Sequence, residues 1–264
     1  MKSITLGYHD VVEDGSLPVD ALRKAPGHYA LDRSAFQQHL LAIRRRTSAN
    51  AVQTIESFPL STEQVPVFLT FDDGALGADT CAADELERLG WRGHFFIITE
   101  WIGTLGFLNA RQIRALRQRG HVIGSHSHTH PSRMSHLTGP TLWREWSKSC
   151  QMLADLLGEP VTTGSIPNGY YSRQVAEMAA QAGIKALFTS EPRTSTFMVN
   201  GCMIVGRYAV MAQTPANEAG AIAAGDVTPR LVQAASWQAK KTAKAVGGKA
   251  YLKLRGAVLN QIRA

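Results

Sequence analysis

Apolar and β-branched runs alternate along the chain with stretches of helical spacing. The apolar runs predict seven strands, at 4–9, 65–71, 93–99, 121–126, 161–166, 184–190 and 202–208. The intervening pattern predicts helices around 33–46, 77–90, 109–119, 139–157 and 171–182, and Gly90 and Gly120 stand where two of them would end. Nearly continuous apolar strands that alternate with helices favour an α/β fold with a parallel sheet covered by helices. Seven such strands could close into a barrel.

Polar residues gather where these strands end. The clusters are Tyr8-His9-Asp10, Asp72-Asp73-Gly74, His126-Ser127-His128-Thr129-His130, Pro167-Asn168-Gly169 and Arg207-Tyr208. In parallel β/α barrels the carboxyl ends of the strands meet on one face, where the chemistry takes place. The pattern therefore predicts that these clusters converge on a single site.

Asp72 and Asp73 are adjacent carboxylates at the end of an apolar strand. Like charges that share a pocket are costly unless a cation or a proton compensates them. A divalent metal on one carboxylate would meet this need and leave the other as a base. The alternative is a solvated turn or a helix N-cap, since Asp-Gly is a common turn dipeptide.

Three histidines lie within five residues. His126 and His130 are four apart, a spacing that suits joint metal binding on a helical turn or a tight loop, whereas His128 between them would point elsewhere. The alternative is a polar loop. One aspartate and two histidines form a three-ligand set that leaves metal positions open for water and substrate.

The sequence TFDDG at 70–74, followed by HSHTH at 126–130, resembles the first two motifs of the polysaccharide deacetylases, also called the NodB-homology domain or family 4 carbohydrate esterases. The resemblance covers about residues 1–210 and implies a catalytic domain folded as a distorted (β/α) barrel. It also implies a divalent metal, Zn²⁺ above all, with Asp73, His126 and His130 as ligands and Asp72 as the general base.

The implied reaction is metal-dependent removal of an N-acyl group, N-acetyl above all, from an amino sugar of a polysaccharide or glycan intermediate. Two alternatives stay open. One is an O-acetyl esterase or small-amide hydrolase on the same scaffold, and the other is a catalytically inactive carbohydrate-binding member of the family.

The third motif of the family, Arg-x-Pro-x-Gly, departs from its pattern here. Ser165 occupies the Arg position, while Pro167, Gly169 and Tyr170 resemble the loop that lines the substrate pocket. Arg207, at the end of the last strand, is our candidate for supplying the missing charge to the base. The alternative for Arg207 is a surface ion pair.

The catalytic histidine of the family's fifth motif has no direct counterpart, because no histidine follows His136. Our candidate for the general acid is His9, since YHDV at 8–11 resembles the N-terminal strand of poly-N-acetylglucosamine deacetylases. A structural His9 hydrogen-bonded to Asp10 is the alternative, and His128 is the second candidate for the acid.

The net charge of +7 is unevenly distributed. Eight cations and no acidic residue follow Asp226, which leaves 20 basic and 21 acidic side chains in residues 1–226. We therefore expect residues 211–264 to be a basic tail, helical or partly disordered, with Trp237, Tyr251 and Leu254 as candidate anchors on an anionic membrane surface. The alternative is a solvated tail, and no nucleic-acid partner is expected.

The chain has no apolar run of the roughly 20 residues that a transmembrane helix needs, and its first residues do not resemble a secretory signal. We accordingly expect a cytoplasmic protein whose tail could attach it to the inner face of the membrane. Cys81, Cys150 and Cys202 are widely spaced, so we expect buried thiols and neither a disulfide framework nor a thiolate zinc site.

Overall fold

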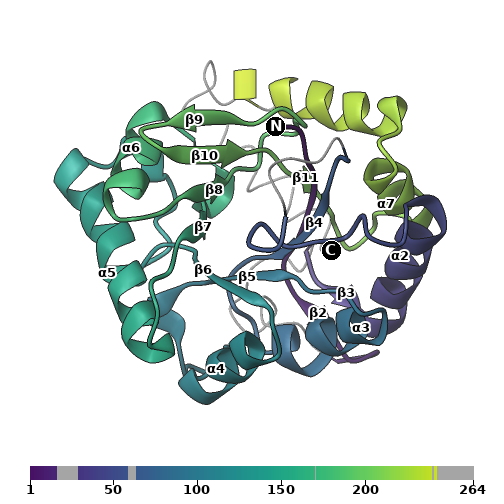
Figure 1. Ribbon diagram of the computed structural model, residues 1–264, viewed down its shortest axis with the longest axis horizontal. Coiled ribbons are helices and arrows are strands. Elements are labelled where there is room, and N and C mark those ends of the chain that lie inside the picture. Colours follow the sequence, from purple (N-terminus) through teal and green to yellow (C-terminus); the bar gives the residue numbers. More distant parts are fainter. Residues whose placement is uncertain (17–28, 59–63, 170, 240, 243–264) are drawn as a thin grey trace, which may run out of the picture.

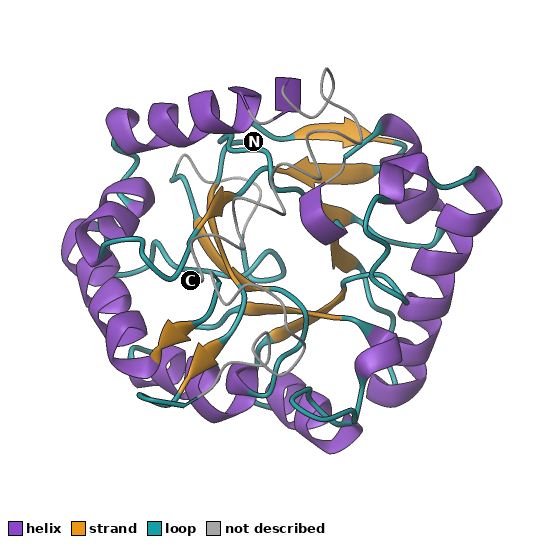
Figure 2. Ribbon diagram, turned by 180° about the vertical axis from the view of Figure 1, so that it is seen from behind, coloured by secondary structure: helices purple, strands orange, loops and turns teal. Residues whose placement is uncertain are grey.

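A ring of helices surrounds a curled sheet in the computed structural model of the chain, which describes residues 1–16, 29–58, 64–169, 171–239 and 241–242 (Figures 1 and 2). Seven strands run parallel to their neighbours around the barrel. In spatial order they are β1 (Ile4–Tyr8), β4 (Val67–Phe71), β5 (His94–Ile97), β6 (Val122–Ser125), β7 (Thr163–Ser165), β8 (Ala186–Phe188) and β10 (Cys202–Val205). Each corresponds to one of the seven predicted runs, and the predicted distorted (β/α) barrel is confirmed.

The last strand closes the barrel by changing its partner. Strand β10 pairs with β8, and after only Gly206 and Arg207 the chain continues as β11 (Tyr208–Ala209), which pairs with β1. A Cβ atom at Gly206 would lie 2.5 Å from the carbonyl oxygen of Glu191, so only glycine fits at this turn of the strand. The kink places Arg207 between the first and last strands.

Three short strands have no counterpart in the sequence prediction. Strand β9 (Phe197–Val199) is antiparallel to β10, whereas β2 (Val11–Val12) and β3 (Leu31–Asp32) form a separate parallel pair. Segments of two or three residues are too short to show a hydrophobic period.

The helices agree closely with the prediction. They are α2 (Arg33–Arg46), a π-helical turn (Ala78–Ala82) continued by α3 (Ala83–Arg88), α4 (Ala110–Gln118), α5 (Gly139–Leu157) and α6 (Arg173–Gln181). Gly90 and Gly120 have φ of 73° and 89°, the left-handed conformation expected after a helix end. None of the helices within the described ranges is both long and apolar enough to cross a membrane.

Alternate residues along each strand face opposite sides, and the inward side carries a layer of aromatic rings. Phe68, Phe96 and Phe188 form one buried cluster with Val205, and the Arg207 guanidinium lies 5.9 Å from the centre of the Phe96 ring. Arg207, at the carboxyl end of β10, thus lies next to a buried aromatic layer in the barrel. The three cysteines are buried and free, as predicted.

Helix α7 (Ala216–Ala223) lies beyond residue 210 and packs beside α2, with Ile222 in the main core cluster. Residues 227–239 are also helical, and Gln233 Nε2 donates to the carbonyl oxygen of Ala209. The division between domain and tail at residue 210 stays a prediction, but these contacts tie the chain that follows it to the barrel. Residues 243–264, with Tyr251 and Leu254, lie outside the described residues.

Candidate active site

Four strands of the barrel bring polar side chains to one edge. Asp72 and Asp73 follow β4, His126 follows β6, Ser165 ends β7, and Arg207 follows β10. Because all these strands are parallel, their carboxyl ends lie on the same face of the barrel. The predicted convergence of the strand-end clusters is therefore seen for these residues.

Asp73, His126 and His130 form a compact three-ligand cluster. One ligand atom from each lies within 4.8 Å of the others. Asp73 Oδ1 is 3.3 Å from His126 Nε2 and 3.7 Å from His130 Nε2. The sequence prediction named these three residues together, and the fold brings them together.

The donor set fits a zinc-like ion. Two ligands at about 2.0–2.1 Å from a tetrahedral ion are about 3.4 Å apart, close to the spacing between Asp73 and each histidine. Among the described residues, Asp73 Oδ1 is also a buried acceptor without a hydrogen-bond partner, although buried carboxylate oxygens are normally satisfied. A cation bound here would satisfy it.

The local backbone is bent to aim these side chains. Asp73, Ser127 and His130 have φ of 74°, 65° and 55°, a left-handed conformation that is uncommon for residues other than glycine. Such departures concentrate where the surrounding structure holds a functional geometry.

A buried carboxylate on α5 holds the histidine loop. Glu145 Oε2 accepts the backbone N–H groups of His128 and Thr129, and Oε1 accepts the Thr129 hydroxyl. Glu145 is 8% exposed, so these hydrogen bonds are largely shielded from water. Nothing in the sequence pattern marks this role, because Glu145 is one polar residue on a long amphipathic helix.

Arg207 contacts the carboxylate predicted to be the base. Its Nη1 and Nη2 donate to Oδ1 and Oδ2 of Asp72 at 2.7 and 2.8 Å, a bidentate pair, and its Nε donates to the carbonyl oxygen of Thr189. Arg207 is 3% exposed, so the alternative of a surface ion pair is wrong.

Ser165 also contacts Asp72. Its hydroxyl donates to Asp72 Oδ1 at 2.9 Å and lies 2.6 Å from His126 Nδ1. The sequence marked this position only as the place of a missing arginine.

The charges of the site set the protonation of its members. Burial alone would raise the pKa of Asp72, but the positive charges of Arg207 and His126 outweigh it and hold that pKa well below its usual range. Burial would likewise raise the pKa of Asp73, whereas the neighbouring His126 and His9 lower it. Burial lowers the pKa of His130 to about 4, which leaves its ring neutral and able to bind a metal near neutral pH.

His9 lies near both carboxylates, since its charge contributes to lowering the pKa of Asp72 and of Asp73. Its ring is tilted by 36° against that of Tyr29, with the ring centroids 4.3 Å apart. Its buried Nδ1 has no hydrogen-bond partner in the part of the chain that the structure describes, so the alternative bond to Asp10 is not made through this atom. His128, the second candidate for the acid, turns its Nδ1 to the Thr99 hydroxyl at 2.9 Å. The geometry favours His9 over His128.

The predicted substrate loop lies at the same edge. Pro167 and Gly169 are buried in a short turn directly after β7, and Tyr170 lies outside the described residues. Trp237, expected in the tail as a membrane anchor, instead lies against this loop: a Cβ atom at Gly169 would be 3.0 Å from its ring. The substrate-binding roles stay predictions.

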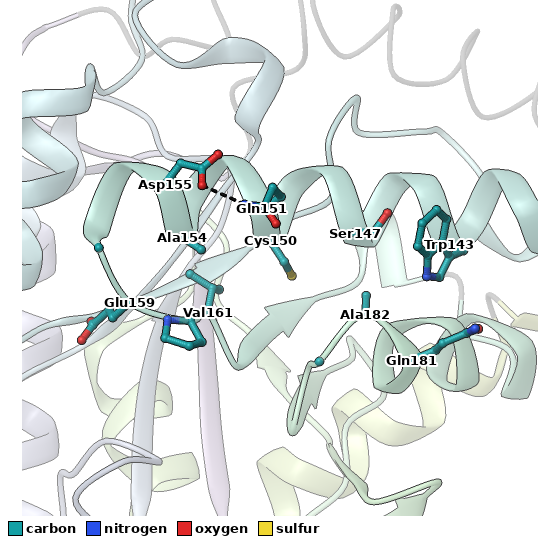
Figure 3. A pocket seen from close by; sticks show the side chains of 13 residues that line it. Trp143, Ser147, Cys150, Gln151, Ala154, Asp155, Glu159, Val161, Gln181 and Ala182 are labelled. Carbon is teal, nitrogen blue, oxygen red and sulfur yellow. Dashed lines mark hydrogen bonds between the residues drawn. The ribbon is translucent and has the colours of Figure 1, made fainter.

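A hollow of about 710 Å³ lies on the outside of the barrel between α5 and α6 (Figure 3). Its lining includes Trp143, Gln151, Asp155 and Gln181, and none of the strand-end residues described above. It is therefore separate from the candidate active site.

Comparison with known proteins supports the family resemblance. Residues 60–187 of this chain match the polysaccharide deacetylase family. This range holds both the Asp72-Asp73 pair and the His126–His130 loop. YxkH from Bacillus subtilis (strain 168) is 24% identical over 191 residues, which are 71% of this chain and 64% of YxkH, so the chain spans less than two thirds of that relative.

Solved structures of polysaccharide deacetylases have the same fold. The Streptococcus pyogenes deacetylase PplD, solved with acetate, superposes with a TM-score of 0.68 at 19% identity and covers 82% of this chain and 96% of its own. The polysaccharide deacetylase BC0361 from Bacillus cereus has a TM-score of 0.69 at 18% identity, over 84% of this chain and 69% of its own.

Removing the carboxylate that holds the histidine loop should weaken metal binding. We expect Glu145→Ala to lower zinc affinity about tenfold or more, because supporting contacts behind metal ligands are typically worth 10–100-fold. Competition with a chromophoric chelator measures the dissociation constant. Asp155→Ala, which removes an exposed carboxylate from the same helix, is the control and should bind zinc as the wild type does. Equal affinity in all three proteins would contradict the role of Glu145.

Proposed function

We propose that this protein is a metal-dependent hydrolase that removes an N-acyl group, N-acetyl above all, from an amino sugar of a polysaccharide or glycan intermediate. The observation that carries the proposal is the pairing of a complete Asp73–His126–His130 ligand set with an ionised Asp72 beside it. A base next to a metal site is the arrangement that amide hydrolysis by an activated water requires.

When bound by Asp73, His126 and His130, a divalent ion such as Zn²⁺ would polarise the acyl carbonyl and acidify a water molecule. The remaining work falls to groups of this chain. Asp72 holds its charge in a buried place because Arg207 donates to both of its oxygens.

The two oxygens of Asp72 differ in what they can accept. Oδ1 already receives hydrogen bonds from Arg207 and Ser165, while Oδ2 receives one from Arg207 and lies 4.0 Å from His126 Nε2, on the side of the ligand cluster. We therefore assign Oδ2 as the oxygen that takes the proton of the attacking water. Arg207 keeps Oδ2 turned toward the cluster.

Departure of the amine requires a proton donor on the other side of the reacting carbon. His9 is our candidate, because it directly follows β1 at the same edge and lies near both carboxylates. Its Nδ1 has no partner within the described residues. A general acid at this position would protonate the leaving nitrogen as the C–N bond breaks.

Release of acetate and formate tests the proposed function directly. We expect zinc-loaded wild type to release one of them from N-acylated amino-sugar oligomers, and Asp72→Asn at matched zinc content to lose about a hundredfold or more in rate, the typical contribution of a general base. Asp155→Asn, with an exposed carboxylate on α5, should keep the wild-type rate.

The same panel separates the alternatives. Release only from O-acetyl esters or small amides would replace the N-deacylase by one of those hydrolases. No release from any substrate, with zinc bound, would indicate a catalytically inactive carbohydrate-binding protein.

The bidentate pair between Arg207 and Asp72 can be tested by a change that keeps the charge. Arg207→Lys supplies one ammonium group in place of the planar fork, so we expect kcat to fall about tenfold or more while KM changes less. Steady-state kinetics measure both constants. Arg193→Lys, a half-buried arginine beside Glu191, is the matched control. A wild-type kcat for Arg207→Lys would exclude the proposed orientation of the base.

We also propose that the C-terminal helix contacts an anionic membrane surface. Val227, Leu231 and Val232 are 60%, 62% and 64% exposed, and the chain after Asp226 carries only positive formal charge. Exposed apolar side chains with nearby cations suit binding at a lipid interface.

Vesicle binding distinguishes this contact from a solvated helix. The full chain should co-sediment with phosphatidylglycerol-containing vesicles, and replacement of Val227, Leu231 and Val232 by Gln should weaken that binding several-fold. The control is replacement of Leu105 by Gln, because Leu105 is an exposed apolar residue of the segment before α4. Equal sedimentation of the wild type and the triple variant would argue against the contact.

A further inference from the structure

The Ser165 hydroxyl touches both functional halves of the site. It lies 2.6 Å from Nδ1 of His126, a residue of the ligand cluster, and 2.9 Å from Oδ1 of Asp72, the base. Ser165 is fully buried at the end of β7, and no water is needed to connect the two residues. No other described side chain is hydrogen-bonded to both His126 and Asp72.

The direction of these hydrogen bonds follows from the chemistry of the imidazole ring. When Nε2 of His126 is the ligand atom, the ring hydrogen is on Nδ1, which must donate. Two acceptors are in reach of Nδ1: the Ser165 hydroxyl at 2.6 Å and the Ser165 carbonyl oxygen at 3.0 Å. A hydroxyl that accepts from Nδ1 has its own hydrogen available for Asp72 Oδ1.

We propose that Ser165 is a positioning residue that couples the metal ligand His126 to the base Asp72. The chain of donors runs from His126 Nδ1 through the Ser165 hydroxyl to Asp72 Oδ1. It fixes the tautomer in which Nε2 faces the ligand cluster, and it occupies Oδ1 so that Oδ2 is left for the water. The catalytic part of this inference rests on the proposed function, whereas the effect on metal binding does not.

A serine at this position complements Arg207. The guanidinium already spans both oxygens of Asp72 from the β10 side, so the β7 side needs only a small neutral group that can donate once and accept once. A hydroxyl meets that requirement, while a second cation would face Arg207 and the two histidines.

Substitution of Ser165 tests the coupling through zinc affinity and through turnover. For Ser165→Ala we expect zinc affinity to fall about tenfold, as for other groups behind a metal ligand, and kcat at saturating zinc to fall about tenfold, with KM within about twofold of the wild type. The matched control is Thr163→Val on the same strand, because the buried Thr163 hydroxyl has no hydrogen-bond partner among the residues that the structure describes. Circular dichroism and thermal unfolding of the zinc-free proteins check the fold, and Ser165→Gly provides a second variant without the hydroxyl.

A double-mutant cycle with Asp72→Asn measures whether the two residues act together. Coupling predicts that Ser165→Ala weakens zinc binding less in the Asp72→Asn background than in the wild type. Zinc affinity within twofold of the wild type for Ser165→Ala, or the same loss in both backgrounds, would overturn the proposal. Because zinc affinity is measured without substrate, it reports on Ser165 even if the protein deacylates none of the sugars tested.

Discussion

The arrangement of the rest of the site depends on two adjacent carboxylates at the end of β4. Asp72 and Asp73 leave the strand into a region shielded from water, where burial disfavours the charge of each. Each carboxylate is therefore compensated separately. Asp72 has the Arg207 guanidinium, and Asp73 has His126 and His130, with which it makes a cluster that could hold a metal ion. The roles proposed for the two carboxylates differ because Asp72 contacts a guanidinium, whereas Asp73 contacts two imidazole rings.

This compensation is linked to how the barrel closes. Arg207 reaches Asp72 because the chain changes its pairing partner from β8 to β1 at Gly206 and Arg207. The Arg207 guanidinium there lies over the Phe96 ring of the aromatic layer. Among the described residues, the Arg207 side chain donates only to Asp72, to the Thr70 hydroxyl and to the Thr189 carbonyl oxygen, and all three residues are buried. The residue that closes the fold is thus also the one that keeps the base ionised.

Local patterns in the sequence predicted the barrel and the ligand cluster. Seven strands and five helical segments were visible because each carries its own apolar period, and Asp73, His126 and His130 lie in two short motifs at strand ends. Contacts between distant segments were not visible in this way. Glu145 supports the histidine loop from α5, Ser165 links His126 with Asp72, and Trp237 lies beside Gly169. None of these contacts leaves a trace in the spacing of one segment, because the partner is brought near only by the folded barrel.

The absence of the third-motif arginine shows that the constraint acts on the carboxylate and not on a position in the chain. A buried base needs one planar cation on its two oxygens, and the barrel can deliver it from the end of any strand that borders the pocket. Once Arg207 supplies it from β10, an arginine at position 165 would place two guanidinium groups on one carboxylate, beside two histidines that a metal site also requires. Repulsion between the two guanidinium groups and a cation at the Asp73 cluster would disfavour binding of that cation. Serine at 165 removes the conflict and keeps a hydrogen bond to Asp72. The serine at position 165 and the arginine at position 207 are therefore best understood as one compensated exchange.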